Sequence, residues 1–178
     1  MKIISVAAVT AGGKTTIVNE LKKRLRNSQS LHFDNYTFEG EVDDFSQCVL
    51  DGENYYNAWN LTPLEDDILK IKSEGKCDYL ILDYPFAYLN DKIKPYIDTA
   101  FFIDTPLDIS LARRILRDMG DATADEIRQD LKTYLQYART SFVQMQKDVL
   151  PSSDYVIDGT LGIEEIVGEI AALVDYKK

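Results

Sequence analysis

The sequence predicts an α/β fold in which a parallel sheet is covered by helices on both faces. Two observations lead to this prediction. Short apolar runs, rich in β-branched and aromatic residues, alternate along the chain with longer segments whose apolar residues recur every three or four positions. The first apolar run, which starts at Ile3, passes through a loop of small residues directly into a helical segment that opens at Lys14. Strands and helices that alternate in this way form a parallel sheet with helices on its two faces.

Length and composition limit the class of protein. The chain of 178 residues has the size of one domain, and 45% hydrophobic residues suffice for a core. Thirty acidic residues against twenty basic ones give a net charge of -10, which argues against nucleic acid or an anionic membrane as a partner. Cys48 and Cys77 have no metal-site spacing and no signal-like apolar segment opens the chain, so we expect a reduced, cytoplasmic setting. His32 is the only histidine, which excludes a site built from several histidines.

The loop at residues 8–15 has the pattern of a cradle for nucleotide phosphates. Lys14 would contact the β- and γ-phosphates and the Thr15 hydroxyl would bind Mg²⁺. The pattern has glycine at its first position, where this chain has Ala8, and we expect Ala8 to adopt a conformation that alanine tolerates. The alternative is an ordinary strand, turn and helix. The predicted nucleotide-binding residues of the loop are Ala11, Gly12, Gly13, Lys14, Thr15 and Thr16.

The next elements are a helix over residues 14–26 and a short strand over residues 31–33, with Asp34 at the carboxyl end of that strand. In an open parallel sheet, chemistry gathers at the carboxyl ends of the strands. We therefore predict that Asp34 binds and deprotonates a phosphoryl acceptor. The alternative is a carboxylate that caps a turn.

Residues 35–61 show no sustained period and mix acidic with aromatic side chains. A connection of this length inside one domain is usually a functional loop or a partly helical insertion, and we interpret it as the acceptor-binding element. Its aromatic side chains would stack on a ring of the acceptor, whereas the alternative is packing in a core. The predicted acceptor-binding residues of this insertion are Tyr36, Tyr55, Tyr56 and Trp59.

A capped helix and a third strand follow. Thr62 at the N-cap, a proline after it and Glu65 at the third helical position predict a helix that reaches Gly75. The apolar run at residues 79–82 predicts a buried strand that ends in Asp83. A carboxylate at this place helps to hold Mg²⁺, and we also expect Asp83 to contribute to the substrate site. The alternative is a turn residue at a strand end.

The fourth strand, residues 100–103, leads to a helix that Thr105 is expected to cap and that runs to Met119. Arginines on this helix lie within roughly 100° of arc and so form one stripe. We expect residues 113–123 to close as a lid over ATP, and the competing interpretation is a solvated helix face. The stripe comprises two predicted catalytic cations, Arg113 and Arg117, and one predicted nucleotide contact, Arg114.

The last part of the chain continues the alternation and completes a single domain. Thr123 and Glu126 predict a capping box at the start of a long helix that stops before Pro151. A fifth strand is predicted over residues 155–157 and a final helix over residues 163–173. The exit of the fifth strand is where we expect adenine, on Gly159 and Thr160.

Several of these segments together carry a family resemblance. They are the loop that ends in Gly-Gly-Lys-Thr-Thr, Asp34, Tyr-Asn-Ala-Trp-Asn at 56–60, Ile-Asp-Thr-Pro at 103–106, Ala-Arg-Arg-Ile-Leu-Arg-Asp at 112–118, and Val-Ile-Asp-Gly at 156–159. With them the chain resembles P-loop small-molecule kinases of the uridine kinase and nicotinamide riboside kinase group. The resemblance implies a three-layer P-loop NTPase fold with strand order 2-3-1-4-5, and ATP and Mg²⁺ as cofactors. It also implies that Asp34 is the acceptor base and that Arg113 and Arg117 bind the ATP phosphates.

The chain departs from this group at two positions of the site. Ala8 replaces the usual first glycine of the loop, and Asp83 stands where uridine kinases generally carry glutamate. The acceptor segment also differs from the nucleoside-binding pattern of the group. These features predict a kinase and do not name its acceptor.

Together these features predict ATP- and Mg²⁺-dependent phosphoryl transfer to a hydroxyl of a small molecule, with a nucleoside as the first expectation. The alternatives are another acceptor, such as a nucleoside monophosphate, dephospho-coenzyme A or a sugar, and a nucleotide-binding regulator without turnover. Residues 35–61 contain no lysine or arginine, which favours an uncharged acceptor, and the absence of an NKxD motif disfavours a GTPase-like switch. The sequence leaves open the acceptor, the choice between ATP and GTP, and the oligomeric state, for which a homodimer is one option.

Overall fold

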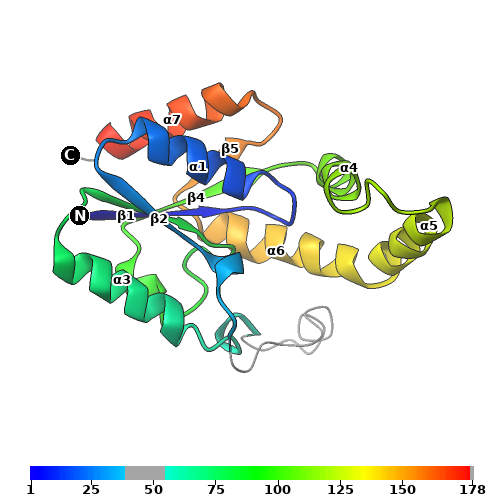
Figure 1. The fold of residues 1–178 in the computed structure, drawn as a ribbon, viewed down its shortest axis with the longest axis horizontal. Coiled ribbons are helices and arrows are strands. Elements are labelled where there is room, and N and C mark those ends of the chain that lie inside the picture. Colours follow the sequence, from blue (N-terminus) through cyan, green and yellow to red (C-terminus); the bar gives the residue numbers. More distant parts are fainter. Residues whose placement is uncertain (39–54, 177–178) are drawn as a thin grey trace.

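The computed structural model describes residues 1–38 and 55–176, and these form three layers (Figure 1). The middle layer is a sheet of five parallel strands in the order β2-β3-β1-β4-β5, which confirms the predicted fold and strand order. Residues 39–54 of the predicted acceptor-binding insertion lie outside the described residues. The strands are β1 (Lys2–Ala7), β2 (Ser28–His32), β3 (Tyr79–Asp83), β4 (Thr99–Asp104) and β5 (Tyr155–Asp158).

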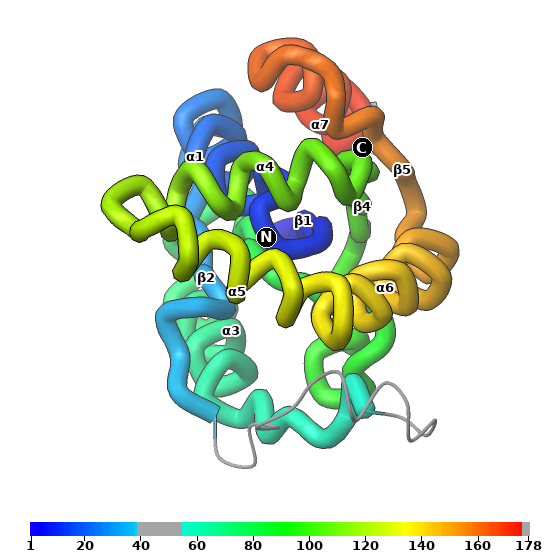
Figure 2. Tube along the Cα trace, turned by 90° about the vertical axis from the view of Figure 1, so that its right-hand side faces the viewer, coloured from blue at the N-terminus to red at the C-terminus, as the bar shows by residue number. Residues whose placement is uncertain are grey.

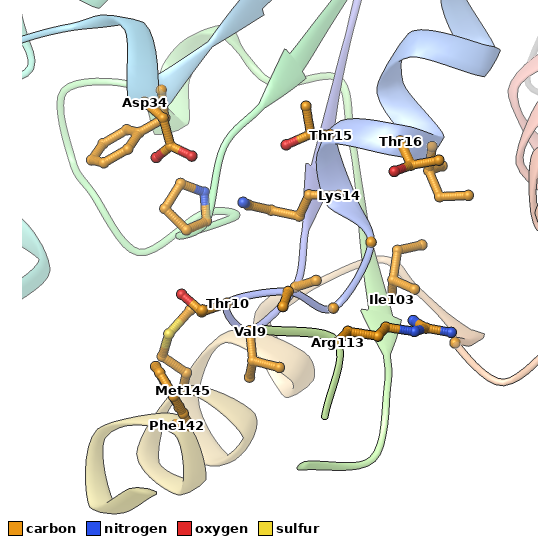
Figure 3. A pocket seen from close by; sticks show the side chains of 18 of the residues that line it. Val9, Thr10, Lys14, Thr15, Thr16, Asp34, Ile103, Arg113, Phe142 and Met145 are labelled. Atoms are coloured by element: carbon orange, nitrogen blue, oxygen red, sulfur yellow. The ribbon is translucent and has the colours of Figure 1, made fainter. Parts of the chain in front are cut away.

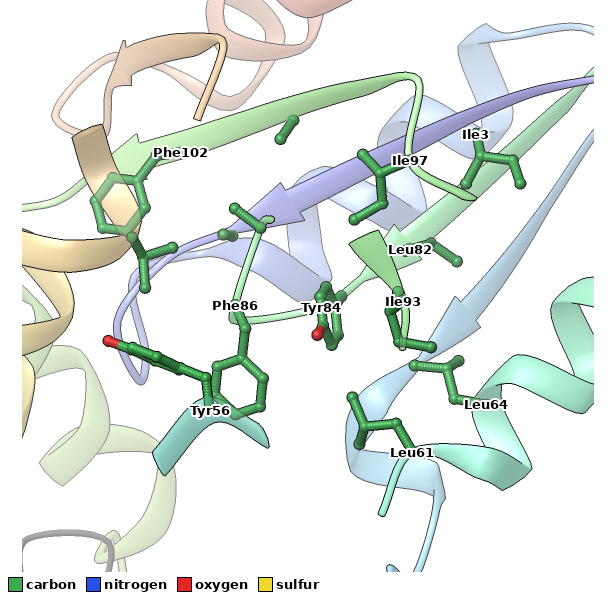
Figure 4. Close-up of a cluster of buried hydrophobic side chains, with 14 of the residues drawn as sticks. Ile3, Tyr56, Leu61, Leu64, Leu82, Tyr84, Phe86, Ile93, Ile97 and Phe102 are labelled. Atoms are coloured by element: carbon green, nitrogen blue, oxygen red, sulfur yellow. The ribbon is translucent and has the colours of Figure 1, made fainter. Parts of the chain in front are cut away.

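Two helices cover each face of the sheet, because alternate residues of the central strands point to opposite sides. On one face Ile4 and Val6 of β1 pack against α1 (Lys14–Arg24) and α7 (Ile163–Tyr176). On the other face Ile3 and Ala7 pack against α3 (Thr62–Glu74) and α6 (Arg139–Ser152). Figure 4 shows part of the second core, where aromatic side chains from the loop after β3 lie between the sheet and the segment before α3.

The segment that contains the predicted lid, residues 113–123, leaves the sheet at the carboxyl ends of the strands and is called the lid below. It consists of α4 (Leu107–Asp118) and α5 (Ala124–Thr133), which continues through a π-helical segment, Tyr134–Ala138, into α6. Figure 1 shows α4 and α5 beyond the carboxyl edge of the sheet, and in Figure 2, which is viewed from that edge, they cross in front of the strands. The predicted capping box is confirmed, because Thr123 and Glu126 exchange side-chain and backbone hydrogen bonds at the start of α5. None of the helices in residues 1–38 and 55–176 is long and apolar enough to span a bilayer.

Two of the predicted N-caps are wrong. The first residue of α3 is Thr62 itself, after Leu61, and the Thr62 amide and hydroxyl both donate to Asn60 Oδ1. The N-cap of α4 is Pro106, because the Thr105 hydroxyl donates instead to the carbonyl oxygen of Gly12 at 2.8 Å. A hydroxyl that has a buried backbone acceptor from another segment is not available to its own helix.

Other differences concern element boundaries. The second strand covers Ser28–His32 rather than residues 31–33. Its first three residues are polar and all its side chains are half-buried, as in an edge strand, so no apolar run marks where it begins. It is followed by the 3₁₀ turn Phe33–Asn35. The long helix ends at Ser152, so the prediction that it stops before Pro151 is wrong. A proline in the last turn removes one hydrogen bond, and the hydroxyls of Ser152 and Ser153 donate to a carbonyl of that turn. Two more 3₁₀ turns, Tyr55–Asn57 and Lys94–Tyr96, lie in the connections around α3 and before β4.

Candidate active site

A cavity of about 640 Å³ lies at the carboxyl edge of the sheet, between the loop after β1 and the lid. The charged side chains among its described lining residues are Lys14, Asp34, Arg113 and Arg117. Figure 3 shows Lys14 between Asp34 on one side of the loop and Arg113 on the other. Lys14 therefore lies between two ends of the cavity, one at Asp34 and the other at Arg113.

The loop between β1 and α1 has the backbone of a phosphate cradle. Ala11 adopts φ 56° and Gly13 adopts φ 102°, so two residues just before α1, on either side of Gly12, are in the left-handed region. A Cβ at Gly12 would lie 2.9 Å from the Ala8 Cβ and 2.8 Å from the Val9 carbonyl oxygen, so only glycine fits there. Ala8 is not among the non-glycine residues of the described chain with positive φ, as expected. The backbone strain lies at Ala11 instead, because an alanine in the left-handed conformation costs roughly 1 kcal/mol.

Three side chains meet at the mouth of the loop. The Thr15 hydroxyl donates to Asp83 Oδ2 at 2.6 Å, and Lys14 Nζ lies 3.3 Å from Asp83 Oδ1. That second contact is an ion pair without hydrogen-bond geometry, so the buried Oδ1 accepts no hydrogen bond from the described residues. A threonine hydroxyl beside a buried carboxylate oxygen with a free lone pair fits a hydrated Mg²⁺ ion. The residues present therefore suit the metal that the sequence implies.

Asp34 faces the cavity from the 3₁₀ turn after β2, across from Lys14 (Figure 3). Its carboxylate is exposed and lines the same space as the phosphate loop. A hydrogen bond from Arg117 to Asp118 raises the pKa of Arg117, and the charge of Asp34 raises it further. The lid arginine therefore lies within electrostatic reach of the candidate base.

The three arginines of the lid have different environments. Arg113 and Arg117 line the cavity. Arg114 points to α5 and forms a bidentate pair with Asp130, in which Nη1 lies 3.1 Å from Oδ1. This hydrogen bonding raises the pKa of Arg114. In this arrangement Arg114 joins the two lid helices, and the structure does not bring it to the cavity.

The four aromatic residues predicted to bind the acceptor lie in different environments. Trp59 lines the cavity, whereas the Tyr36 hydroxyl donates to Asp67 on α3 at 2.8 Å. The hydroxyls of Tyr55 and Tyr56 both donate to Asp148 on α6, at 2.9 and 3.2 Å. Burial, reinforced by these carboxylates, raises the pKa of all three tyrosines. The tyrosines thus attach the segments on both sides of residues 39–54 to the body of the domain.

The other end of the cavity is bounded by the loop after β5. Gly159 lines it, and a Cβ on this residue would overlap Thr105. Thr160 is not among the lining residues, because its amide and hydroxyl both donate to Asp158 Oδ1. Ile103, Leu161 and other aliphatic side chains complete an apolar surface there.

Sequence reasoning missed several residues of the cavity. Phe33 directly precedes Asp34, and Phe86 lies three residues after Asp83. Phe142 and Met145 lie three residues apart on one face of α6. Their helical or strand-end spacing is the same as that of core residues, and Figure 3 shows Phe142 and Met145 beneath the loop. Proximity to the two strand-end aspartates is the signal that would have found the first pair.

Comparisons with known proteins point to kinases. The chain is 24% identical to the uridine kinase of Borrelia hermsii over 88% of its length and 86% of that protein. It is 21% identical to uridine-cytidine kinase B of Dictyostelium discoideum over 99% of its length and 84% of that protein. A third relative, the chloroplastic uridine/cytidine kinase of Arabidopsis thaliana, is 24% identical over 86% of this chain but only 36% of its own length. No protein-family model matches the chain.

Solved structures agree on the fold. Shikimate kinase from Aquifex aeolicus superimposes with a TM-score of 0.51 at 19% identity and covers 98% of this chain and 97% of its own. Deoxyadenosine kinase from M. mycoides superimposes with a TM-score of 0.51 at 11% identity and covers 98% and 99%. The chain thus resembles uridine kinases in sequence and P-loop kinases in fold.

Proposed function

We propose that this protein transfers the γ-phosphoryl group of ATP to a hydroxyl of an uncharged small molecule, with a nucleoside as the acceptor. The observation that carries the proposal is the placement of Lys14 and Asp34 across one cavity, with the phosphate loop on one side and an aromatic wall on the other. Phosphoryl transfer requires a phosphate cradle, cations and a carboxylate beside the acceptor, and residues of these types line this cavity, which supports the proposal.

In the proposed reaction the acceptor oxygen attacks the γ-phosphorus, its proton passes to a carboxylate oxygen of Asp34, and ADP leaves with the electron pair of the broken bond. Backbone N–H groups of residues 11–16 hold the phosphates, and Lys14, Arg113 and Arg117 stabilise the charge that develops on them. Thr15 and Asp83 would hold Mg²⁺, which would supply positive charge against the phosphates.

The chemistry of the acceptor end supports an uncharged, ring-containing acceptor. Phe33, Trp59 and Phe86 form an aromatic wall there, with ring centroids 5.4 to 5.9 Å apart. The cations that line the cavity are those assigned to ATP, so a second phosphate has no separate clamp among the described lining residues. The names of the relatives, uridine and uridine-cytidine kinases, agree with a nucleoside.

The test is ADP release with ATP and Mg²⁺ across nucleosides, nucleoside monophosphates and sugars. We expect a nucleoside to raise release well above background. In Asp34→Asn we expect kcat to fall by about 10²- to 10⁴-fold while the Kd for ATP stays within about threefold, because Asp34 acts on the acceptor. Asp66→Asn, on the exposed surface of α3, is the matched control and should behave like the wild type.

Two results would contradict the proposal. If no acceptor raises ADP release although the wild type binds ATP, the protein is a nucleotide-binding regulator without turnover. If a nucleoside monophosphate is preferred over every nucleoside, the uncharged acceptor is wrong while the phosphoryl transfer stands.

A further inference from the structure

The single histidine of the chain lies beside the carboxylate that we assign to Mg²⁺. His32 is the last residue of β2 and pairs in register with Asp83, the last residue of β3. Its Nδ1 lies 3.1 Å from Asp83 Oδ2, and its Nε2 lies 3.2 Å from the hydroxyl oxygen of Ser30. The side chain is 20% exposed, so the ring is held between the two strands.

The chemistry of the partners assigns the proton positions. A carboxylate only accepts hydrogen bonds, so Nδ1 of His32 carries a hydrogen and donates it to Asp83. Nε2 lies within hydrogen-bonding distance of the Ser30 hydroxyl, which makes one chain of hydrogen-bonded groups from Ser30 through His32 to Asp83.

Asp83 Oδ2 receives a second hydrogen bond from Thr15 at 2.6 Å. Two donors on the same oxygen fix the rotation of the carboxylate, so that Oδ1 turns toward Lys14 and the mouth of the loop. With one donor missing, Asp83 rotates about its terminal torsion and competes for Lys14 as a closer ion pair. The free lone pairs of Oδ1 would then lose the orientation that they have beside Lys14.

We propose that His32 is a positioning residue that orients Asp83 and thereby sets the affinity of the site for Mg²⁺ with ATP. The inference rests on the proposed function, because it takes Thr15 and Asp83 to be the residues that would hold the metal. Partners that orient a metal-binding carboxylate typically contribute 10- to 100-fold to metal affinity.

Two amide substitutions separate this role from packing. In His32→Asn the side-chain NH₂ group occupies about the place of Nδ1 and still donates to Asp83. In His32→Gln the NH₂ group reaches the place of Nε2 and loses that donor. The readout is calorimetric binding of ATP over a series of Mg²⁺ concentrations, with the thermal midpoint of each variant as a check on folding.

We expect His32→Gln to raise the Mg²⁺ concentration that half-saturates ATP binding by about tenfold, with the metal-free Kd for ATP within about twofold of the wild type. His32→Asn should stay within about threefold of the wild type. Equal Mg²⁺ dependence in the two variants, or an equal loss of ATP binding with and without Mg²⁺, would overturn the inference.

The failure of the proposed function gives a different result. If the wild type binds ATP without any dependence on Mg²⁺, or binds no ATP, the assignment of the cavity itself is wrong. If the wild type binds and turns over normally but His32→Gln matches it at every Mg²⁺ concentration, only the role of His32 is wrong. Should His32→Gln fail to fold, His32→Ala removes the same donor to Asp83, and a Mg²⁺ dependence equal to that of His32→Asn in that variant overturns the inference.

Discussion

At the scale of single residues, Thr105 contacts both Gly159, which follows the fifth strand, and Gly12 of the phosphate loop. A Cβ at Gly159 would lie 2.0 Å from Thr105 Oγ1 and 2.8 Å from its Cα, and that Oγ1 donates to the Gly12 carbonyl. We expect Gly159→Ala to lower the free energy of unfolding by about 3 kcal/mol, because a backbone atom must shift. For a domain of this size the melting temperature falls by about 6 to 12 °C, which calorimetry measures.

The same chain offers a matched control. Gly168 lies in the middle of α7, where an added Cβ would meet nothing within 4 Å. Gly168→Ala should raise the free energy of unfolding by about 0.5 to 1 kcal/mol, because alanine is the better helix former. Equal melting temperatures for the two alanine variants would contradict the close contact at Gly159.

Single-residue partnerships were the hardest part of the site to predict. The sequence placed Asp34 and Asp83 at strand ends, since an apolar run that stops at a carboxylate is a local signal. The contacts of His32 with Asp83 and of Thr105 with Gly12 join residues 51 and 93 positions apart. Such pairs depend on the register of neighbouring strands, which no local pattern specifies.

At the scale of elements, the lid depends on few buried contacts. Its described helices bury only Ser110 on α4 and no residue on α5, so the Arg114–Asp130 pair is a main link between them. We expect Asp130→Ala to weaken this link by about 1.5 kcal/mol, because the pair is bidentate and largely shielded from water. Amide hydrogen exchange in α4 and α5 should quicken by about tenfold and remain unchanged in β1 and β3.

An exposed pair on the same helix provides the control for the lid. Arg128 and Asp125 form a salt bridge in which the side chains are 68% and 92% exposed. Arg128→Ala should leave exchange in the lid nearly unchanged, since exposed pairs contribute little. Slower exchange in Asp130→Ala, or faster exchange in β3 as well as in the lid, would mean that the pair does not act locally.

The elements themselves were largely predictable, and the failures share one cause. The Thr123 capping box was confirmed because both partners lie within one turn. The predicted cap at Thr105 was wrong because that hydroxyl serves a different segment. The π-helical segment at Tyr134–Ala138 has apolar residues at the same three- and four-residue spacing as an α-helix, so periodicity did not distinguish it.

At the scale of the whole molecule, buried tyrosines make the fold sensitive to alkali. Burial raises the pKa of Tyr84 well above its ordinary value, and burial also raises the pKa of Tyr36, Tyr55 and Tyr88. In the unfolded chain the tyrosine hydroxyls lose their protons near pH 10, whereas in the folded chain they keep them. The free energy of unfolding is therefore at its full value below pH 10 and falls as the pH rises further. Each such tyrosine lowers the free energy of unfolding by a further amount of about 1.4 kcal/mol per pH unit in this range.

Tyr84→Phe isolates one of these protons. The Tyr84 hydroxyl is fully buried and has no hydrogen-bond partner among the described residues, so its removal should raise the free energy of unfolding by about 1 kcal/mol at pH 7. Urea unfolding at pH 9 and pH 11 should then show a smaller loss of stability than in the wild type. Tyr137→Phe, at an exposed hydroxyl, is the control, and an identical loss in both variants would contradict the assignment.

The architecture of the whole molecule followed from the order of its elements, because alternating strands and helices permit few topologies. The cavity was only partly predictable for the opposite reason. Phe33, Phe86 and Met145 come from three separate segments, and their role depends on how the lid and α6 return to the sheet. Packing of that kind is decided by the complete set of contacts rather than by any one segment.

The location of Trp59 has a practical consequence. It is the only tryptophan of the chain, it lies in the wall of the cavity, and its buried indole N–H donates to none of the described residues. Light absorbed at the red edge of the indole band is therefore emitted from this one place. The emission spectrum of the unlabelled protein should report acceptor occupancy directly, which allows stopped-flow measurement of its arrival and departure.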